Sequence, residues 1–149
     1  GQLLRRHGDQ IKRLTGGYYR ALGRVDDTMN LGGVKVGSVE IERVLNRLDG
    51  VAETAAIAIS PPDGGPSQLV IFTVLESTVN TGSNELLLRM QTTIKREINP
   101  LFKLNNLRIV EVLPRTASNK IMRRTLRTFY QKSEPHYSIK RNRDQESNT

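Results

Sequence analysis

Two apolar runs stand out in the middle of the chain, at residues 51–59 and 68–76. Both are rich in the β-branched and aliphatic side chains that favour strands. The segment between them reads SPPDGGPS, and its prolines and glycines exclude a helix there and favour a turn. The pattern therefore predicts two strands joined by a loop.

Helical periodicity appears on either side of these strands. The segment 38–50 is expected to be a helix with Ser38 as N-cap, Glu40 in its first turn and Gly50 at its end. A second helix is expected over 85–98, where Pro100 stops it. The apolar side chains that define the two faces are Ile41, Val44, Leu45 and Leu48, and then Leu87, Met90, Ile94 and Ile98.

A last helix is predicted from Ile121 onward. Its apolar stripe, which is more typical of a core than of a ligand site, consists of Met122, Leu126, Phe129 and Tyr130. The basic side chains Arg123, Arg124 and Arg127 are expected at solvated positions on this helix.

The remaining strands are shorter. The sequence IKRLTGGYYRAL, at 11–22, predicts a β-hairpin around a glycine turn. A second strand pair, MNL and VKV, surrounds Gly32 and Gly33, and LRIVEV at 107–112 is a further strand. This order predicts an α+β fold in which an N-terminal hairpin precedes a small mixed three-stranded sheet packed with helices.

The length, 149 residues, suits one domain but is short for an enzyme that encloses two substrates, and the chain begins with Gly, so we expect a fragment of a larger protein. There is no cysteine, and His7 and His136 are too few and too far apart to indicate a metal centre. No apolar run approaches the roughly 20 residues of a membrane span. We expect an intracellular protein, in the cytoplasm or an organelle matrix, with the peroxisome among the candidates.

The net charge of +8 is concentrated near the C-terminus. Between 113 and 143 there are nine basic residues and one acid, Glu134, so this stretch accounts for the whole excess. A solvated basic tail explains such a run, and so does a surface that meets phosphate groups.

Several short motifs have ordinary explanations when each is taken alone. Asp9 follows a glycine and suits a turn, and Arg24 with Asp26 and Asp27 suits an exposed ion-pair cluster. Lys120, in LPRTASNKIMRR, could be a solvated residue at the start of a helix. The chain contains no glycine-rich phosphate loop and no nucleophile elbow.

The order and spacing of these motifs nevertheless resemble one family. GD, then seven residues and GYY, then GRVDD, a glycine loop before an EIE helix, and finally LPRTASNKIMRRTLR are similar to the C-terminal domain of AMP-forming acyl-CoA synthetases. The acetyl-CoA-synthetase-like branch, with the plant acyl-activating enzymes, is most similar. The resemblance covers roughly 8–127. The same domain occurs in luciferases and peptide-synthetase adenylation modules, so the resemblance predicts the fold more narrowly than the reaction.

The resemblance implies two half-reactions. A carboxylate attacks the α-phosphate of ATP to form acyl-AMP, and coenzyme A then displaces AMP. Lys120 matches the family's adenylation lysine, a catalytic residue whose ammonium stabilises charge on the phosphate. Asn119 stands where the family has glycine, and because asparagine tolerates positive φ we expect the turn to persist.

Further residues match the family's nucleotide and hinge positions. Asp9 corresponds to the aspartate that binds the ribose hydroxyls, and Arg24 to an arginine beside the nucleotide. Asp26 corresponds to the hinge about which the family's small domain swings. The expected division is therefore a hairpin over 1–25, a lid domain over 26–133 and a polar, disordered tail over 134–149.

The resemblance implies that the small domain takes a second orientation, in which a different side of it meets coenzyme A. Gly33 would line the pantetheine tunnel, Lys35 would lie near the phosphate, and Lys95 would meet the 3′-phosphate of coenzyme A. The carboxylate pocket, the main ATP site and Mg²⁺ would belong to a larger N-terminal domain, so this chain alone is expected to be inactive. No metal site is expected in the chain itself.

Two alternatives to an acyl-activating ligase remain open from the sequence. One is a non-enzymatic module whose basic region binds nucleic acid, although few aromatic residues lie among the basic ones. The other is a degenerate relative that keeps the domain as a regulatory lid. With the ligase as the leading hypothesis, the expected partners are the N-terminal domain and a carboxylic acid, with neither nucleic acid nor a membrane.

Overall fold

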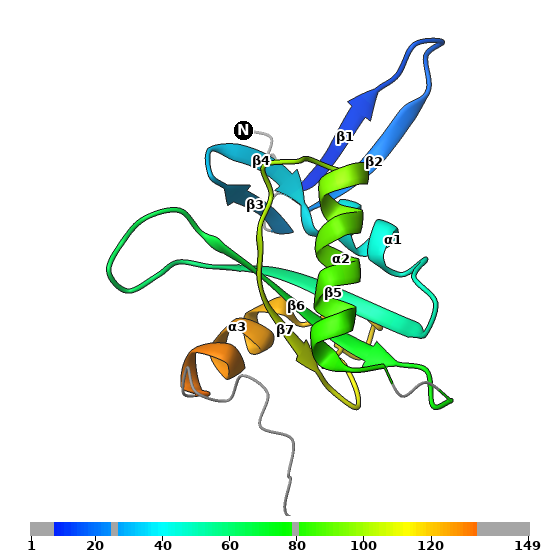
Figure 1. The fold of residues 1–149 in the computed structure, drawn as a ribbon. Helices are drawn as coiled ribbons and strands as arrows, with labels where there is room; N and C mark the ends of the chain where they lie inside the picture. Colours follow the sequence, from blue (N-terminus) through cyan, green and yellow to red (C-terminus); the bar gives the residue numbers. More distant parts are fainter. Residues whose placement is uncertain (1–7, 25–26, 79–80, 134–149) are drawn as a thin grey trace, which may run out of the picture.

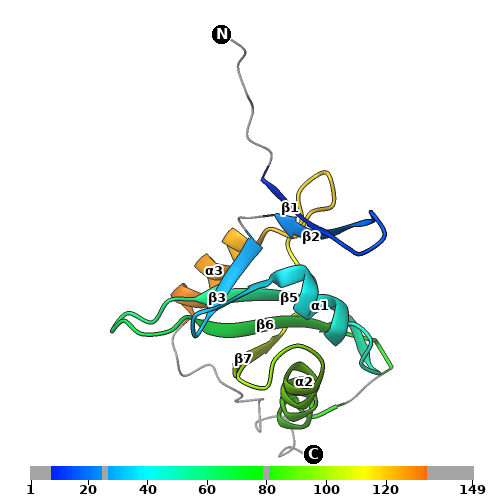
Figure 2. The same ribbon diagram turned by 90° about the horizontal axis from the view of Figure 1, so that it is seen from above.

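A computed structural model describes residues 8–24, 27–78 and 81–133. Within these ranges, a three-stranded sheet lies between helices on its two faces, and two small hairpins precede it in the chain (Figures 1 and 2). The α+β class and the mixed sheet predicted from the sequence are both confirmed.

The two hairpins come first. Strands β1 (Asp9–Arg13) and β2 (Tyr19–Arg24) pair antiparallel, and so do β3 (Thr28–Leu31) and β4 (Val34–Gly37). The β3–β4 turn consists of Gly32 and Gly33, with φ of 62° and 90°. Two successive positive φ angles define the tight hairpin turn that glycine favours, because it carries no Cβ.

The central sheet has the order β5–β6–β7. Strands β5 (Val51–Ile59) and β6 (Gln68–Leu75) are antiparallel, whereas β7 (Leu104–Ile109) lies parallel to β6. The last strand begins three residues before the predicted start at 107 and ends three before the predicted end. Its first residues look like a loop because they are polar, but Asn105 Oδ1 accepts a hydrogen bond from the Leu69 backbone at 3.0 Å. That bond replaces the solvation that a loop would supply.

Side chains of β5 and β6 alternate between two separate cores. One core joins Ala56, Leu69 and Ile71 to helices α1 (Ser38–Leu45) and α2 (Ser83–Glu97), and we call this side of the sheet the α2 face. The other joins Ile57, Phe72 and their neighbours to Leu113 and to helix α3 (Arg123–Lys132), and we call it the α3 face. Figure 2 shows α2 and α3 on opposite sides of the sheet.

The helix boundaries differ from two sequence predictions. Helix α1 begins with Ser38 as its first residue, because Gly37 takes the extended N-cap conformation, and it ends at Leu45. Ser38 Oγ is buried and has no hydrogen-bond partner among the described residues, so the predicted serine cap is wrong. In α3, Leu126 is buried as predicted, but Phe129 is 55% exposed and Met122 39% exposed, so the apolar stripe is only partly core.

Within the described parts of the chain, no helix is long and apolar enough to cross a membrane. The same residues contain no group of three or more His, Asp or Glu side chains that could hold a metal ion.

Candidate functional site

Lys120 lies on a short hairpin that connects Leu113 to α3. The Met122 amide donates to the Pro114 carbonyl at 2.8 Å, and the Thr116 amide donates to the Lys120 carbonyl at 2.8 Å. A β-bridge between Arg115 and Ile121 lies between these two bonds. We call residues 114–122 the lysine hairpin. Its backbone is closed by hydrogen bonds at both its base and its tip.

The tip of the lysine hairpin depends on Asn119. This residue has a positive φ of 64°, as its position before Lys120 predicts. Its amide donates to the Thr116 carbonyl at 2.9 Å, and the Lys120 amide donates to Thr116 Oγ1 at 3.1 Å. Asparagine is suited to this turn, since it tolerates positive φ better than other non-glycine residues.

One side chain of the hairpin links its tip to the central sheet. Arg115 Nη1 donates to the Asn119 carbonyl at 3.0 Å, and its other terminal nitrogen pairs with Glu53 on β5. The Lys120 side chain is exposed and makes no hydrogen bond or ion pair with any described residue. A fixed backbone that carries a free ammonium can deliver a positive charge to a ligand phosphate without first breaking another contact.

Three residues further on, Arg123 is in a very different environment. Its guanidinium donates to both carboxylate oxygens of Glu42 on α1, with Nη2 at 2.8 and 2.7 Å, and its Nη1 donates to Asp27 Oδ2 at 3.1 Å. The side chains of Arg123 and Glu42 are only 10% and 8% exposed. We call Arg123, Glu42 and Asp27 the arginine cluster.

The arginine cluster also contacts the sheet, because Glu42 Oε1 accepts the backbone amide of Ala56 on β5 at 2.8 Å. Burial raises the pKa of Glu42, against the lowering effect of the Arg123 hydrogen bonds and charge. The expectation that Arg123 is solvated is thus wrong. Arg123 precedes the buried Leu126 by three residues, so the two share a helix face, but this spacing alone does not show that Arg123 is buried, since Met122 on that face is 39% exposed.

The hairpin β1–β2 brings two of the predicted nucleotide residues opposite each other. Asp9 and Arg24 are cross-strand partners in its register, although they are 15 positions apart in the sequence. Asp26, the predicted hinge residue, lies outside the described residues.

The predicted coenzyme A residues lie on other elements. Gly33 is in the β3–β4 turn, and Lys35 is exposed on β4, opposite Asn30. Lys95 is exposed in the last turn of α2. An added Cβ at Gly33 would meet no atom within 4 Å, so within the domain only its φ of 90° favours glycine.

The lysine hairpin and the elements that carry the predicted coenzyme A residues pack against opposite faces of the central sheet. The β3–β4 hairpin contributes Met29, Leu31 and Val36 to the core of the α2 face, where the helix bearing Lys95 also packs. The lysine hairpin contributes Ile121 to the α3 face, next to Leu113 at its base. The structure therefore does not bring Lys120 together with Gly33, Lys35 and Lys95.

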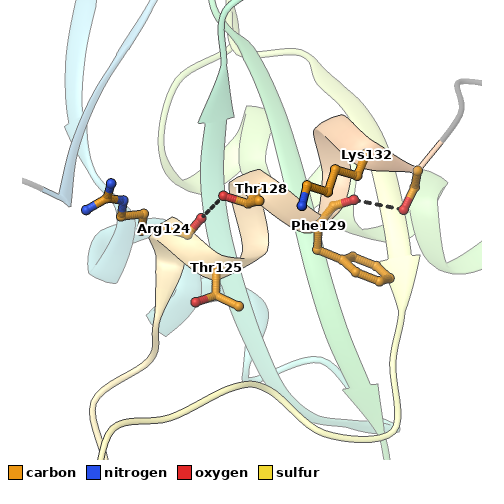
Figure 3. Close-up of a pocket in the computed structure, with 6 residues that line it drawn as sticks. Arg124, Thr125, Thr128, Phe129 and Lys132 are labelled. Atoms are coloured by element: carbon orange, nitrogen blue, oxygen red, sulfur yellow. Dashed lines mark hydrogen bonds between the residues drawn. The ribbon is translucent and has the colours of Figure 1, made fainter.

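A shallow pocket of about 470 Å³ lies along the outer side of α3. In Figure 3, Arg124 and Phe129 point in different directions from the helix, and the Thr128 hydroxyl donates a hydrogen bond to the Arg124 carbonyl. Arg124 is exposed, unlike its neighbour Arg123. None of the residues that line this pocket belongs to the predicted site.

Relatives of this chain have names that describe acyl activation. It is 56% identical over 130 residues to probable acyl-activating enzyme 17, peroxisomal, of Arabidopsis thaliana, covering 85% of this chain and 18% of that protein. It is 52% identical over 130 residues to hexanoyl-CoA synthase of Cannabis sativa, with the same coverage of 85% and 18%. The chain thus spans about a fifth of the length of these curated relatives.

Solved structures agree with the sequence relatives. The fold superposes with a TM-score of 0.72 and 28% identity on the crystal structure of the anthranilate CoA ligase AuaEII in complex with anthranoyl-AMP, over 82% of this chain and 23% of that one. The family model of the AMP-binding enzyme C-terminal domain matches residues 40–120, from the first turn of α1 to Lys120. This chain belongs to the family of AMP-binding enzyme C-terminal domains.

Proposed function

We propose that this chain is the mobile C-terminal domain of an AMP-forming acyl-activating enzyme. A larger N-terminal domain would hold the carboxylic acid, ATP and Mg²⁺, and coenzyme A would accept the acyl group. The observation that carries the proposal is the separation of the Lys120 side from the Gly33 and Lys95 side by the thickness of the central sheet. A domain that presents different faces in two half-reactions requires such a separation.

In the first half-reaction, Lys120 would place its ammonium beside the α-phosphate as a carboxylate attacks it. The negative charge that develops on the phosphate oxygens is stabilised by a fixed positive charge in a site from which water is excluded. Asp9 and Arg24 would act with it, the carboxylate accepting hydrogen bonds from the ribose hydroxyls and the guanidinium lying beside the nucleotide.

In the second half-reaction, the domain would turn about Asp26, and the α2 face would meet coenzyme A. The exposed turn at Gly33 lets a ligand approach the backbone closely. Lys35 and Lys95 would supply positive charge to phosphate groups, each as a point charge without the two-pronged geometry of arginine. Residues 1–25 would form the hairpin that precedes the hinge, and 26–133 would form the lid domain that turns.

The nucleic-acid alternative is not favoured. Two of the nine basic residues in the C-terminal stretch, Arg115 and Arg123, are engaged by Glu53 and by Glu42 with Asp27. These two cations are therefore not available to neutralise a phosphate backbone.

The name of the Arabidopsis relative contains the word peroxisomal. We extend that location to the protein to which this chain belongs. A fluorescent fusion of the whole protein that stays outside peroxisomes would overturn this part of the proposal.

The reaction is tested by joining this chain to the remaining part of the Arabidopsis relative, with that relative itself as the positive control. Pyrophosphate exchange reports acyl-AMP formation, and thioester formation from added acyl-AMP reports the second step. Lys120→Ala is expected to slow the first step by about 10²- to 10³-fold, the range for loss of one charge-stabilising donor, and to spare the second.

Two matched variants complete the design. Lys132→Ala removes an exposed lysine of α3 and should change neither step. Lys95→Ala should weaken only the coenzyme A step. The proposal fails if the fusion exchanges no pyrophosphate while the native relative does, or if Lys120→Ala leaves exchange unchanged.

A further inference from the structure

Residues 115–120 of the lysine hairpin are all exposed, so its position depends on the anchors at its base. Leu113 and Ile121 contribute apolar contacts there, and Arg115 pairs with Glu53 through side chains that are about one-third exposed. Solvent-exposed ion pairs of that kind contribute about 0.2–1 kcal/mol. The more buried anchor is the arginine cluster, which begins one residue after the hairpin ends.

The arginine cluster joins three parts of the domain at the N-terminal end of α3. This helix has no side-chain N-cap, because Met122 precedes it. Arg123 links its first turn to α1 through Glu42, to β5 through the Ala56 amide that Glu42 accepts, and to Asp27. Asp27 is the residue directly after Asp26. A single guanidinium therefore connects the base of the lysine hairpin to the residue beside the proposed hinge.

The contact between Arg123 and Glu42 fixes an orientation as well as a distance. Arg123 donates to Glu42 through Nε and Nη2 together, at 3.2 Å and 2.7–2.8 Å. A planar fork held at two points fixes the orientation of the guanidinium as well as its position. The C-terminal half of α3 has separate anchors, because Leu126 is buried and Tyr130 accepts a hydrogen bond from Asn106 at 3.0 Å. Loss of Arg123 would thus release the start of the helix and not its end.

We propose that Arg123 is a positioning residue for acyl-AMP formation: with Glu42 and Asp27 it holds the lysine hairpin rigidly to the segment after the hinge, so that Lys120 reaches the phosphate when the domain turns. This inference rests on the proposed function. Misplacement of a reacting group by about 1 Å costs on the order of 10²-fold in rate, so a loose hairpin would slow the step that uses Lys120.

The lead variant is Arg123→Lys in the fusion with the Arabidopsis relative's remaining part. Lysine keeps the charge beside Glu42 but cannot form the fork. Pyrophosphate exchange should slow by about 10- to 100-fold in kcat, with little change in the KM for ATP, because Arg123 does not touch the ligand. Thioester formation from added acyl-AMP should be unchanged, which a general loss of folded protein would not produce.

Two further variants test whether the effect is specific to the loss of the Arg123 contacts. Arg124→Gln alters the adjacent exposed arginine and should leave both steps as in the parent. Arg123→Gln combined with Glu42→Gln removes the two most buried charges of the cluster together, so Glu42 is not left without its cation, and it should slow pyrophosphate exchange at least as much as Arg123→Lys. Equal slowing of both half-reactions, or no slowing by either Arg123 variant, would overturn the inference.

A readout that does not depend on activity separates this inference from the proposed function. Amide hydrogen exchange of residues 114–122 in the same fusion should accelerate in the Arg123 variants and not in Arg124→Gln. If exchange of these amides is unchanged, the cluster does not hold the hairpin, whatever the enzyme catalyses. A different result would separate the two proposals. If the hairpin amides exchange hydrogen faster in the Arg123 variants while Lys120→Ala leaves pyrophosphate exchange unchanged, the cluster holds the hairpin but the assigned reaction is wrong.

Discussion

Lys120 and Arg123 are two basic residues of one motif, three positions apart, and their side chains lie in opposite environments. Lys120 is exposed at the tip of a hairpin, whereas the Arg123 side chain is 10% exposed and contacts two carboxylates. The difference arises from the turn between them: α3 begins at Arg123 and orients its first side chain toward α1. A run of like charges can thus contain one exposed residue and one that is buried in the fold.

The largest expected effect on stability comes from breaking the buried member of the pair. Arg123→Gln leaves Glu42 buried without its cation and should lower the free energy of unfolding by about 3–5 kcal/mol. Lys120→Gln should change it by less than about 0.5 kcal/mol, as for an exposed residue without partners. Urea unfolding of the two variants measures the contrast directly. Equal losses would show that burial does not distinguish the two residues.

A second contrast tests the same principle within α3. Leu126→Ala removes a side chain that is 3% exposed in the core of the α3 face and should cost about 2–5 kcal/mol. Phe129 contacts Phe72 edge-on with 6.2 Å between ring centroids, but it is 55% exposed. Phe129→Ala should therefore cost less than Leu126→Ala in the same unfolding experiment. The reverse order would mean that the exposed ring contributes more than its burial indicates.

The tip of the lysine hairpin offers a smaller effect. Asn119→Gly should stabilise or leave unchanged a turn with φ of 64°, whereas Asn119→Ala should lower stability by about 1 kcal/mol, because a Cβ without a polar group disfavours that conformation. Thermal unfolding of both variants gives the order. If alanine proves as stable as asparagine, the positive φ carries no cost in this hairpin.

The smallest effect concerns pH. Burial raises the pKa of Glu42 above its usual value of 4.5, so the folded protein binds more protons than the unfolded chain just above pH 4.5. The contribution of Glu42 to stability is therefore fully present below pH 4.5 and is lost as pH rises through the raised value. Glu42→Gln cannot titrate. As pH rises, the free energy of unfolding of the parent should fall relative to that of Glu42→Gln. A relative rise would contradict the raised pKa.

Much of the fold followed from local pattern. Strands β5 and β6 were predicted within a residue of their bounds, since each is a long apolar run between strong turn signals. The predicted range of β7 was displaced because Asn105 and Asn106 are polar and look like loop residues. Their hydrogen bonds to Leu69 and Tyr130 allow them to lie in a strand. The Ser38 cap failed because Gly37 occupies the N-cap position instead.

Part of the candidate site was likewise predictable from the sequence, and part of it was not. Sequence motifs singled out Lys120, Asp9, Arg24, Gly33, Lys35 and Lys95, and their roles stay predictions. The positive φ of Asn119 was predictable, because asparagine tolerates that conformation and the residue lies in a short turn before Lys120. The pairing of Asp9 with Arg24 depends on the register of the β1–β2 hairpin, which contains an irregularity after Gln10 that its glycine turn does not reveal. The arginine cluster was missed, because its three members are 15 and 81 residues apart along the chain.

By itself, the sequence determined the order of strands and helices, the family and the residues worth testing, since these depend on periodicity, turn chemistry and motif spacing over short distances. Only the tertiary structure decided which face of the sheet each residue occupies and which basic residue is buried. Those outcomes depend on how β5 and β6 divide their side chains between two cores and on how α3 meets α1. Desolvation of a guanidinium requires carboxylates from distant segments, and no local pattern shows where those segments meet.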